Sequence, residues 1–314
     1  MIDDDKLLKN NLDKINNTNF VFIMILKEGG YMTLTSEKKK KFAIFYDDSF
    51  NKIKELELNL GMNIYNTFCF KDNLFAISDY FTKTIQFFIV ENKEIKKKYK
   101  IISEGPTVIE QINENKYIII NECKRYIYER INEENFQIVS IIYDNFFGNN
   151  IFLLNNERFV TGYYDRIKFY SIIFCNQIHE MNIYIPYDVS MGLINENLLA
   201  ICSFRRLNII NINNYTIVNS ILNKDNFYLW NIDPISENNF LIGIYKHDPY
   251  NFQMTSLIQK CKINNDGINF FVIENKAIEG KPAGLINIKG NRYIFLSKYI
   301  YILKFNENNI EKKN

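Results

Sequence analysis

The sequence predicts an all-β fold, a seven-bladed β-propeller built from four-stranded antiparallel blades. Short polar turns that open into apolar strands recur at a nearly constant spacing, and helical periodicity is almost absent. A fixed period in the low forties is typical of propellers with four-stranded blades. The turns are anchored at Asn73, Asn115, Glu157, Asn197, Asn239 and Asn291, which are 42, 42, 40, 42 and 52 residues apart.

The unit around Glu157 illustrates the four steps of the repeat. Short strands rich in branched and aromatic residues are expected at 151–154, 159–162, 167–172 and 177–183, with turn-forming residues between them. An earlier turn, Glu28-Gly29-Gly30, extends the series toward the N-terminus. We expect one domain over residues 1–314, with blades at about 17–60, 62–102, 103–143, 145–183, 184–224, 226–278 and 280–310.

The last unit is short of one strand. Strands are expected at 284–288, 292–297 and 300–305, after which nine mostly polar residues remain. Residues 6–14 could supply the fourth strand and close the ring. The alternative is a short N-terminal helix that begins at the acidic residues 3–5.

The step of 52 residues between Asn239 and Asn291 indicates an insertion in the sixth unit. We place it within Lys246–Thr255, between the second and third strands of that unit. Insertions in single repeats commonly map to a binding face.

Two units resemble the middle of a WD repeat, residues 74–88 and, more closely, residues 158–170. Each has a strand ending in small residues, an Asp in the turn (Asp79 and Asp165), and a strand of alternating apolar residues. No unit carries the Trp-Asp or Gly-His pairs of that family, so its characteristic hydrogen-bond network is not carried over. The resemblance implies a WD-repeat-like propeller that acts as a scaffold for protein–protein interaction, and a propeller of another lineage is the alternative.

Composition limits the classes of partner and the cellular compartment that we expect for this protein. The chain has 38 basic and 36 acidic side chains, a net charge of +2, so no global field favours nucleic acid. The apolar run at 20–26 is too short to cross a bilayer, and we expect no membrane insertion. Five dispersed cysteines favour reduced thiols over disulfides. We expect a eukaryotic, intracellular protein, located in the cytoplasm and with the nucleus left open.

A catalytic set is not evident. The two histidines, His179 and His247, fall in different units, and no nucleotide-binding glycine loop or hydrolase elbow occurs. Asp79, Asp165 and Asp233 could form a dispersed ring, although turn capping explains each of them. We therefore expect no enzyme, cofactor or metal site. The basic runs at 38–41 and 96–98 are expected to be solvated.

The segments that connect consecutive units are rich in aromatic residues, which are frequent in protein interfaces. Gap filling between blades is the alternative role. The candidate partner-binding residues are Tyr143, Phe146, Phe147, Tyr184, Tyr187, Phe227, Tyr228, Trp230, His247 and Tyr250. We expect a non-enzymatic scaffold, a subunit or adaptor of a larger complex that binds one or more proteins. The alternative is a propeller enzyme or small-ligand receptor with a polar site on the central axis.

Overall fold

A computed structural model gives the fold. Every regular element in the described part of the chain is a β-strand, as the absence of helical periodicity predicts. The described residues are 19–37, 40–58, 66–70, 72–79, 82–102, 106–121, 124–132, 135–143, 150–185, 189–203, 206–222, 228–247, 254–264, 267, 270–279, 284–288, 292–296 and 300–304.

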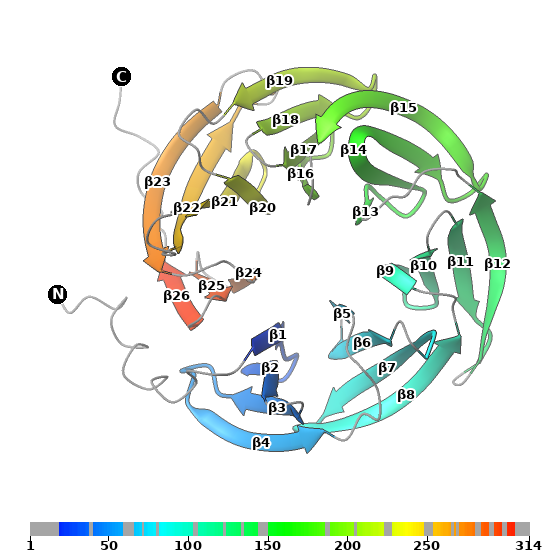
Figure 1. The fold of residues 1–314 in the computed structure, drawn as a ribbon, viewed down its shortest axis with the longest axis vertical. Helices are drawn as coiled ribbons and strands as arrows, with labels where there is room; N and C mark the ends of the chain where they lie inside the picture. Colours follow the sequence, from blue (N-terminus) through cyan, green and yellow to red (C-terminus); the bar gives the residue numbers. More distant parts are fainter. Residues whose placement is uncertain are drawn as a thin grey trace. The chain divides into compact units, whose positions relative to one another are not determined.

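The chain divides into two compact units, the first of which spans Thr18–Ile183. Its strands pair in sequence order into antiparallel sheets (Figure 1). The strands are β1 (Asn19–Ile25), β2 (Tyr31–Glu37), β3 (Lys40–Tyr46), β4 (Lys52–Leu58), β5 (Asn66–Cys69), β6 (Leu74–Asp79), β7 (Thr84–Glu91), β8 (Glu94–Ile102), β9 (Pro106–Asn113), β10 (Lys116–Asn121), β11 (Lys124–Arg130), β12 (Phe136–Tyr143), β13 (Asn150–Leu153), β14 (Arg158–Ser171) and β15 (Asn176–Ile185).

The second unit holds the strands that follow. They pair in the same sequential order, β16 to β19, β20 to β23 and β24 to β26. Their bounds are β16 (Val189–Asn195), β17 (Leu198–Ser203), β18 (Arg206–Asn211), β19 (Thr216–Leu222), β20 (Tyr228–Ser236), β21 (Asn239–His247), β22 (Met254–Ile263), β23 (Phe270–Glu279), β24 (Gly284–Ile288), β25 (Arg292–Leu296) and β26 (Ile300–Lys304).

The long strand β14 provides two arms of its sheet. Its first arm pairs with β13, from Leu153 opposite Phe159 to Asn150 opposite Gly162. The chain then turns back on itself, and two contacts join the two arms of β14. The Ile172 N–H donates to the Glu157 carbonyl at 2.7 Å, and the rings of Phe159 and Tyr170 stack at 4.9 Å. This sheet therefore completes a four-stranded meander although β14 is continuous (Figure 1).

The prediction of seven four-stranded blades is wrong. Six sheets complete a four-stranded blade, and the last sheet, β24 to β26, has three strands in the described residues. The turn spacing marks seven units, and six of these units form four-stranded blades. Residues 6–14, proposed to close the ring or to form a helix, lie outside the described residues.

The ten-residue excess of the sixth blade lengthens its strands. Lys246 pairs with Thr255 and His247 with Met254, so both ends of the expected insertion continue the β21–β22 ladder. β21, β22 and β23 have 9, 10 and 10 residues, against 6, 6 and 7 in β17, β18 and β19. Some of the extra residues thus lengthen the β21–β22 hairpin.

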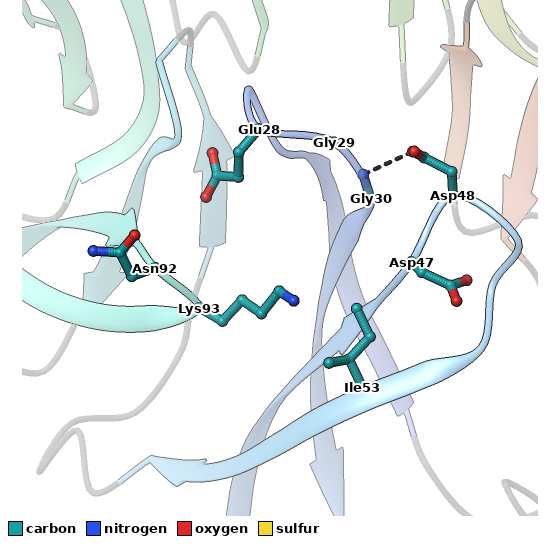
Figure 2. Close-up of a pocket in the computed structure, with 8 residues that line it drawn as sticks. All are labelled: Glu28, Gly29, Gly30, Asp47, Asp48, Ile53, Asn92 and Lys93. Carbon is teal, nitrogen blue, oxygen red and sulfur yellow. Dashed lines mark hydrogen bonds between the residues drawn. The ribbon is translucent and has the colours of Figure 1, made fainter.

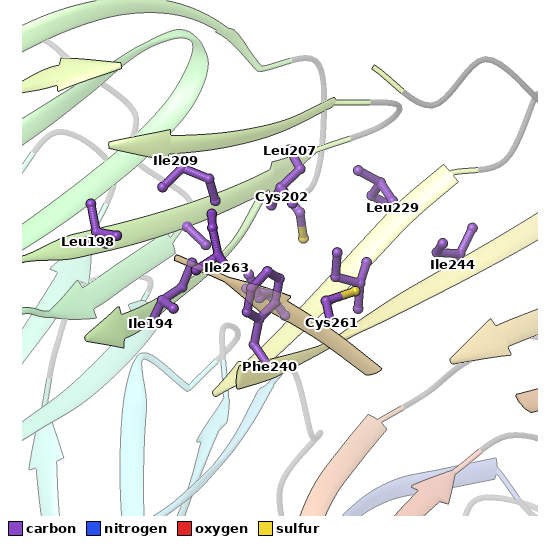
Figure 3. Packing of buried hydrophobic residues seen from close by; sticks show 13 residues of the cluster. Ile194, Leu198, Cys202, Leu207, Ile209, Leu229, Phe240, Ile244, Cys261 and Ile263 are labelled. Atoms are coloured by element: carbon purple, nitrogen blue, oxygen red, sulfur yellow. The ribbon is translucent and has the colours of Figure 1, made fainter. Parts of the chain in front are cut away.

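Apolar side chains fill the space between neighbouring sheets. In the first unit, rings of sheets β5–β8 and β9–β12 meet, with Phe87 and Tyr117 edge to face at 5.1 Å. In the second unit, residues of sheets β16–β19 and β20–β23 form one buried cluster around Phe240 (Figure 3). Because a single sheet cannot bury both of its faces, each depends on its neighbours.

The turn between the first and second strands repeats in detail. Three asparagines, one per sheet, each accept two main-chain N–H groups through Oδ1. They are Asn113 (from Asn115 and Lys116, both 2.9 Å), Asn155 (from Glu157, 2.9 Å, and Arg158, 2.8 Å) and Asn195 (from Asn197 and Leu198, both 2.9 Å). A short amide side chain that bonds its own backbone favours a turn over a continued strand.

In five sheets a second bond ties this turn to the end of the third strand. The carbonyl of the anchor residue accepts the N–H there, in Val90 to Asn73 (3.0 Å), Arg130 to Asn115 (2.8 Å), Ile172 to Glu157 (2.7 Å), Ile212 to Asn197 (2.9 Å) and Ile263 to Asn238 (2.9 Å). The predicted anchors are confirmed in four sheets. In the sixth blade the role falls to Asn238 in place of Asn239.

Replacing Asn155 with Ala should lower the free energy of unfolding by about 1 kcal/mol, because two N–H groups of an exposed turn lose their acceptor. Asn155→Asp keeps an acceptor oxygen and should stay within about 0.5 kcal/mol of the natural protein. Chemical denaturation measures both. An Asp variant as unstable as the Ala variant would show that the Oδ1 bonds are not the cause.

Candidate functional site

A polar pocket of about 530 Å³ lies in the first unit, where turns of two neighbouring sheets meet (Figure 2). The turn between β1 and β2 contributes residues 28–30, and the segment between β3 and β4 contributes Asp47 and Asp48, followed by Ile53. The turn between β7 and β8 adds Asn92 and Lys93. Three carboxylates thus surround a cavity that contains one lysine.

Glycine is required at one wall of this pocket. Gly30 has a φ of +77°, and a Cβ there would lie 2.2 Å from the carbonyl oxygen of Tyr46. The Gly30 N–H donates to Asp48 Oδ1 at 2.8 Å, which joins the two turns (Figure 2). At Gly29, with a φ of +96°, an added Cβ would meet only the Asp48 carboxylate, at 3.4 Å.

The carboxylates of the pocket accept hydrogen bonds from the turns that form it and from a neighbouring turn. Asp47 accepts the N–H groups of Ser49 and Asn51 and the Asn51 amide, and these bonds, the Asn51 side chain first, lower its pKa. Glu28 accepts from the Asn73 amide at 2.6 Å. The site is thus a polar seam between sheets, and its acidic groups accept hydrogen bonds that hold the surrounding turns in place.

The residues around this seam are linked by further polar contacts. Lys27 lies 3.0 Å from Asp72, and this bond raises the pKa of the exposed lysine. Its main-chain N–H donates to Asn73 Oδ1 at 2.7 Å. In the described residues no group of three or more His, Cys, Asp or Glu side chains is arranged to hold a metal ion. The sequence indicates residues 28–30 only as a turn, because the turns that meet at this pocket are about 45 residues apart in the chain.

Tyr143, the predicted partner-binding residue of the first unit whose side chain is described, belongs to the opposite edge of the sheets from the pocket. In a sequential antiparallel meander, turns after the first and third strands share one edge, and connections after the second and fourth share the other. Tyr143 ends the fourth strand β12 and is 71% exposed. The pocket and Tyr143 therefore lie at different edges of the first unit.

The structure describes the other candidates only in part. Tyr184 lies in β15, Tyr228 and Trp230 in β20, and His247 ends β21, but their side chains are not among the described ones. Phe146, Phe147, Tyr187, Phe227 and Tyr250 lie outside the described residues. The partner-binding face as a whole stays a prediction.

Beside Tyr143 lies an apolar surface that the sequence pattern does not predict. It comprises Ile138 (47% exposed), Ile141 (36%) and Tyr143 of β12, together with Ile102 (77%) at the end of β8. The Tyr128 hydroxyl donates to the Ile102 carbonyl at 3.4 Å, which joins β8 to sheet β9–β12. We call these four residues the β12 strip. Grouped exposed apolar side chains are common at interaction sites.

The β12 strip lies on one face of its sheet. Ile138, Ile141 and Tyr143 pair with Tyr128, Tyr126 and Lys124 of β11, which alternate along that strand. A one-residue bulge at Val139 lets Ile138 and Ile141 share this face although they are three residues apart. Period-two alternation along the sequence therefore does not reveal that Ile138 and Ile141 share a face.

The dispersed aspartates are not equivalent. Asp79 accepts the Thr82 N–H at 3.2 Å, which confirms turn capping, and the exposed Asp165 pairs with Arg166 at 2.9 Å. Asp233 differs, since it lies in β20 and its buried Oδ2 has no hydrogen-bond partner among the described residues. Burial raises the pKa of Asp233 to about 6.

A second carboxyl group of this kind lies in the first unit. Glu110, in the first strand β9, has its pKa raised to about 7 by burial. Desolvation disfavours the charged form, so this carboxyl group titrates near neutrality. Such groups are candidates for acid–base or ligand-binding roles.

The remaining expectations concern histidine, lysine and cysteine. His179 lies in the fourth strand β15, and exposed lysines 96–98 lie in β8, where Lys96 pairs with Glu91 at 2.8 Å. Cys69, Cys175, Cys202 and Cys261 are free thiols. Among the described residues no helix is long and apolar enough to span a bilayer.

Comparison with known proteins gives the fold and no more. A crystal structure of a protein from Lactobacillus plantarum superposes with a TM-score of 0.59 at 10% sequence identity, over 82% of this chain and 84% of that chain. The chain therefore has a β-propeller fold with four-stranded antiparallel blades. No protein-family profile matches the sequence. No curated protein matches it either.

Gly30→Ala should destabilise the protein by several kcal/mol, on the order of 3, because both the positive φ and the Tyr46 carbonyl oppose a Cβ. Gly29→Ala is the matched control and should cost about 1 kcal/mol, because it shares the strain of a positive φ but its Cβ meets only the Asp48 side chain. Thermal and chemical unfolding measure the difference. Equal losses in the two variants would contradict this assignment.

Asp233→Asn should stabilise the protein above pH 7, by about 1 to 3 kcal/mol. The pKa of Asp233 is raised from 3.8 to about 6, so the folded state binds the proton more tightly than the unfolded state. This group's contribution is therefore present below pH 3.8 and is lost as pH rises through 6. Denaturation at pH 5, 6, 7 and 8 tests it, and the exposed Asp72→Asn serves as control. A lower stability of Asp233→Asn at pH 8 would contradict the role of burial.

Proposed function

We propose that this protein is a non-enzymatic scaffold for protein–protein interaction, a WD-repeat-like propeller that serves as a subunit or adaptor of a larger complex. The observation that supports it best is the β12 strip, where exposed Ile138 and Ile141 continue into Tyr143 at the edge expected to carry the aromatic connections. Burial of exposed apolar groups is the main driving force of protein association. The proposed setting is the cytoplasm or nucleus of a eukaryotic cell.

The internal hydrogen bonding and packing of the sheets support this role. Five of the blades are tied internally by the turn bonds, and buried apolar clusters join neighbouring sheets within each unit. Binding to a preformed surface loses little conformational entropy on association. Connections held at fixed positions by such sheets are therefore well suited to recognising a partner.

Simultaneous replacement of Tyr187, Tyr228 and Trp230 with Ala should weaken capture of partner proteins at least tenfold, because aromatic residues carry much of the energy of interfaces. Affinity capture from the native organism followed by mass spectrometry measures this. Lys93→Ala, at the pocket edge of the sheets, is the control and should capture normally. Unchanged capture by a well-folded triple variant would count against this face.

One observation favours a second candidate, a propeller enzyme or small-ligand receptor. Glu110 and Asp233 each lie in the first strand of a blade with a pKa raised by burial, to about 7 and about 6. Keeping such groups partly desolvated is a feature of many functional sites. A small molecule that raises the melting temperature of the natural protein but not of Glu110→Gln would support this candidate over the scaffold.

A further inference from the structure

Among the described residues the fourth strand of each blade has no further strand beside it, and two of these edges, β4 and β8, are rich in charged side chains. Each is the terminal strand of its sheet, so alternate backbone N–H and C=O groups point away from the ladder. In β4 and β8 the sequences KIKELEL and EIKKKYKII place charged side chains along this edge. Lysines on an edge strand discourage unwanted pairing.

The ladder registers allow these strands to be compared position by position. Each pairs with the third strand through a one-residue bulge, at Ile53 in β4, Lys98 in β8, Val139 in β12 and Val218 in β19. Aligned on the bulge, the β12 positions 138, 141 and 143 correspond to Lys52, Glu55 and Glu57 in β4, and to Lys97, Lys100 and Ile102 in β8.

Strand β12 lacks charged side chains along its edge. Its sequence, FQIVSIIY, contains no charged residue, in a chain where 24% of residues are charged. The exposed Ile138 and Ile141 replace two lysines of β8. The equivalent residues of β19 are Ile217, Ser220 and Leu222. They are also uncharged, but the polar Ser220 stands where β12 has Ile141.

A single positive charge marks one end of the β12 strip. Lys124 is the register partner of Tyr143, and its ammonium lies 5.9 Å from the centre of that ring. Among the described residues Lys124 has no carboxylate partner. A ligand that lies along the strip would thus meet apolar side chains first and a cation at the Tyr143 end.

We propose that β12 binds an extended segment of a partner protein, which adds as a strand to the free edge beyond the bulge, along residues 140–143. The segment carries branched or aromatic residues at alternate positions and an acidic residue beside Lys124. Its backbone pairs with β12, and its side chains pack beside the β12 strip as cross-strand neighbours. This inference rests on the proposed scaffold function and names the chemistry of its partner.

The test uses the full-length protein, immobilised and exposed to a displayed library of random twelve-residue peptides. The expected result is enrichment of peptides with alternating apolar residues and one acidic residue near an end. The best peptide, synthesised with a fluorescent label, should bind with a micromolar Kd. Hydrogen exchange should show slower exchange of amides within residues 140–143 when it is bound.

Ile138→Lys combined with Ile141→Lys gives β12 the two lysines of β8 and should weaken peptide binding at least tenfold. The matched control, Ile217→Lys, changes the equivalent position of β19, where Ile217 is 44% exposed, and should bind within twofold of the natural protein. If the double variant does not fold, Lys124→Glu serves instead and should reverse the preference for an acidic residue.

Three outcomes would overturn the proposal: no enrichment, equal binding by the double variant, or a dimer of the natural protein that the double variant dissociates, which would mean that a second copy covers the β12 strip. Ultracentrifugation detects the dimer. If peptides fail to bind while partner capture still depends on Tyr187, Tyr228 and Trp230, the scaffold function stands and this inference alone fails.

Discussion

The hydrogen bond between the anchor carbonyl and the end of the third strand is the constraint on which five of the blades depend. It holds the turn between the first two strands against the third strand, in five sheets at 2.7 to 3.0 Å. In three of these sheets an asparagine side chain fixes the same turn from within. Register follows from this point, because a slip of one residue would exchange the two faces of every strand.

Much of the fold could be predicted because these turns are local. An asparagine that bonds to the backbone two and three residues later leaves a mark at a fixed place in the sequence, so Asn115, Glu157 and Asn197 were located correctly. The count of complete blades could not be obtained in this way. A turn of this type connects the first two strands whether the sheet has three strands or four.

The site residues were harder to predict, for two reasons. The pocket joins Glu28 to Lys93 across neighbouring sheets, and the β12 strip joins Ile102 to Ile138 across another pair. Only the packed structure brings such residues together. The bulge at Val139 then changes the face on which later side chains of β12 lie, so period-two alternation fails there. Asp233 was assigned to turn capping because its sequence neighbours do not reveal that it lies in a strand with a buried oxygen.

The sequential pairing of strands has a consequence for how the chain acquires its structure. Each blade contains only neighbouring segments of about 40 residues, so its ladder can form before the next blade has left the ribosome. The faces of that first blade stay wet until a neighbour arrives. Early blades would therefore pass through a stage in which aromatic surfaces such as those of Phe87 and Tyr117 are open to water, and this stage is when molecular chaperones would have most to protect.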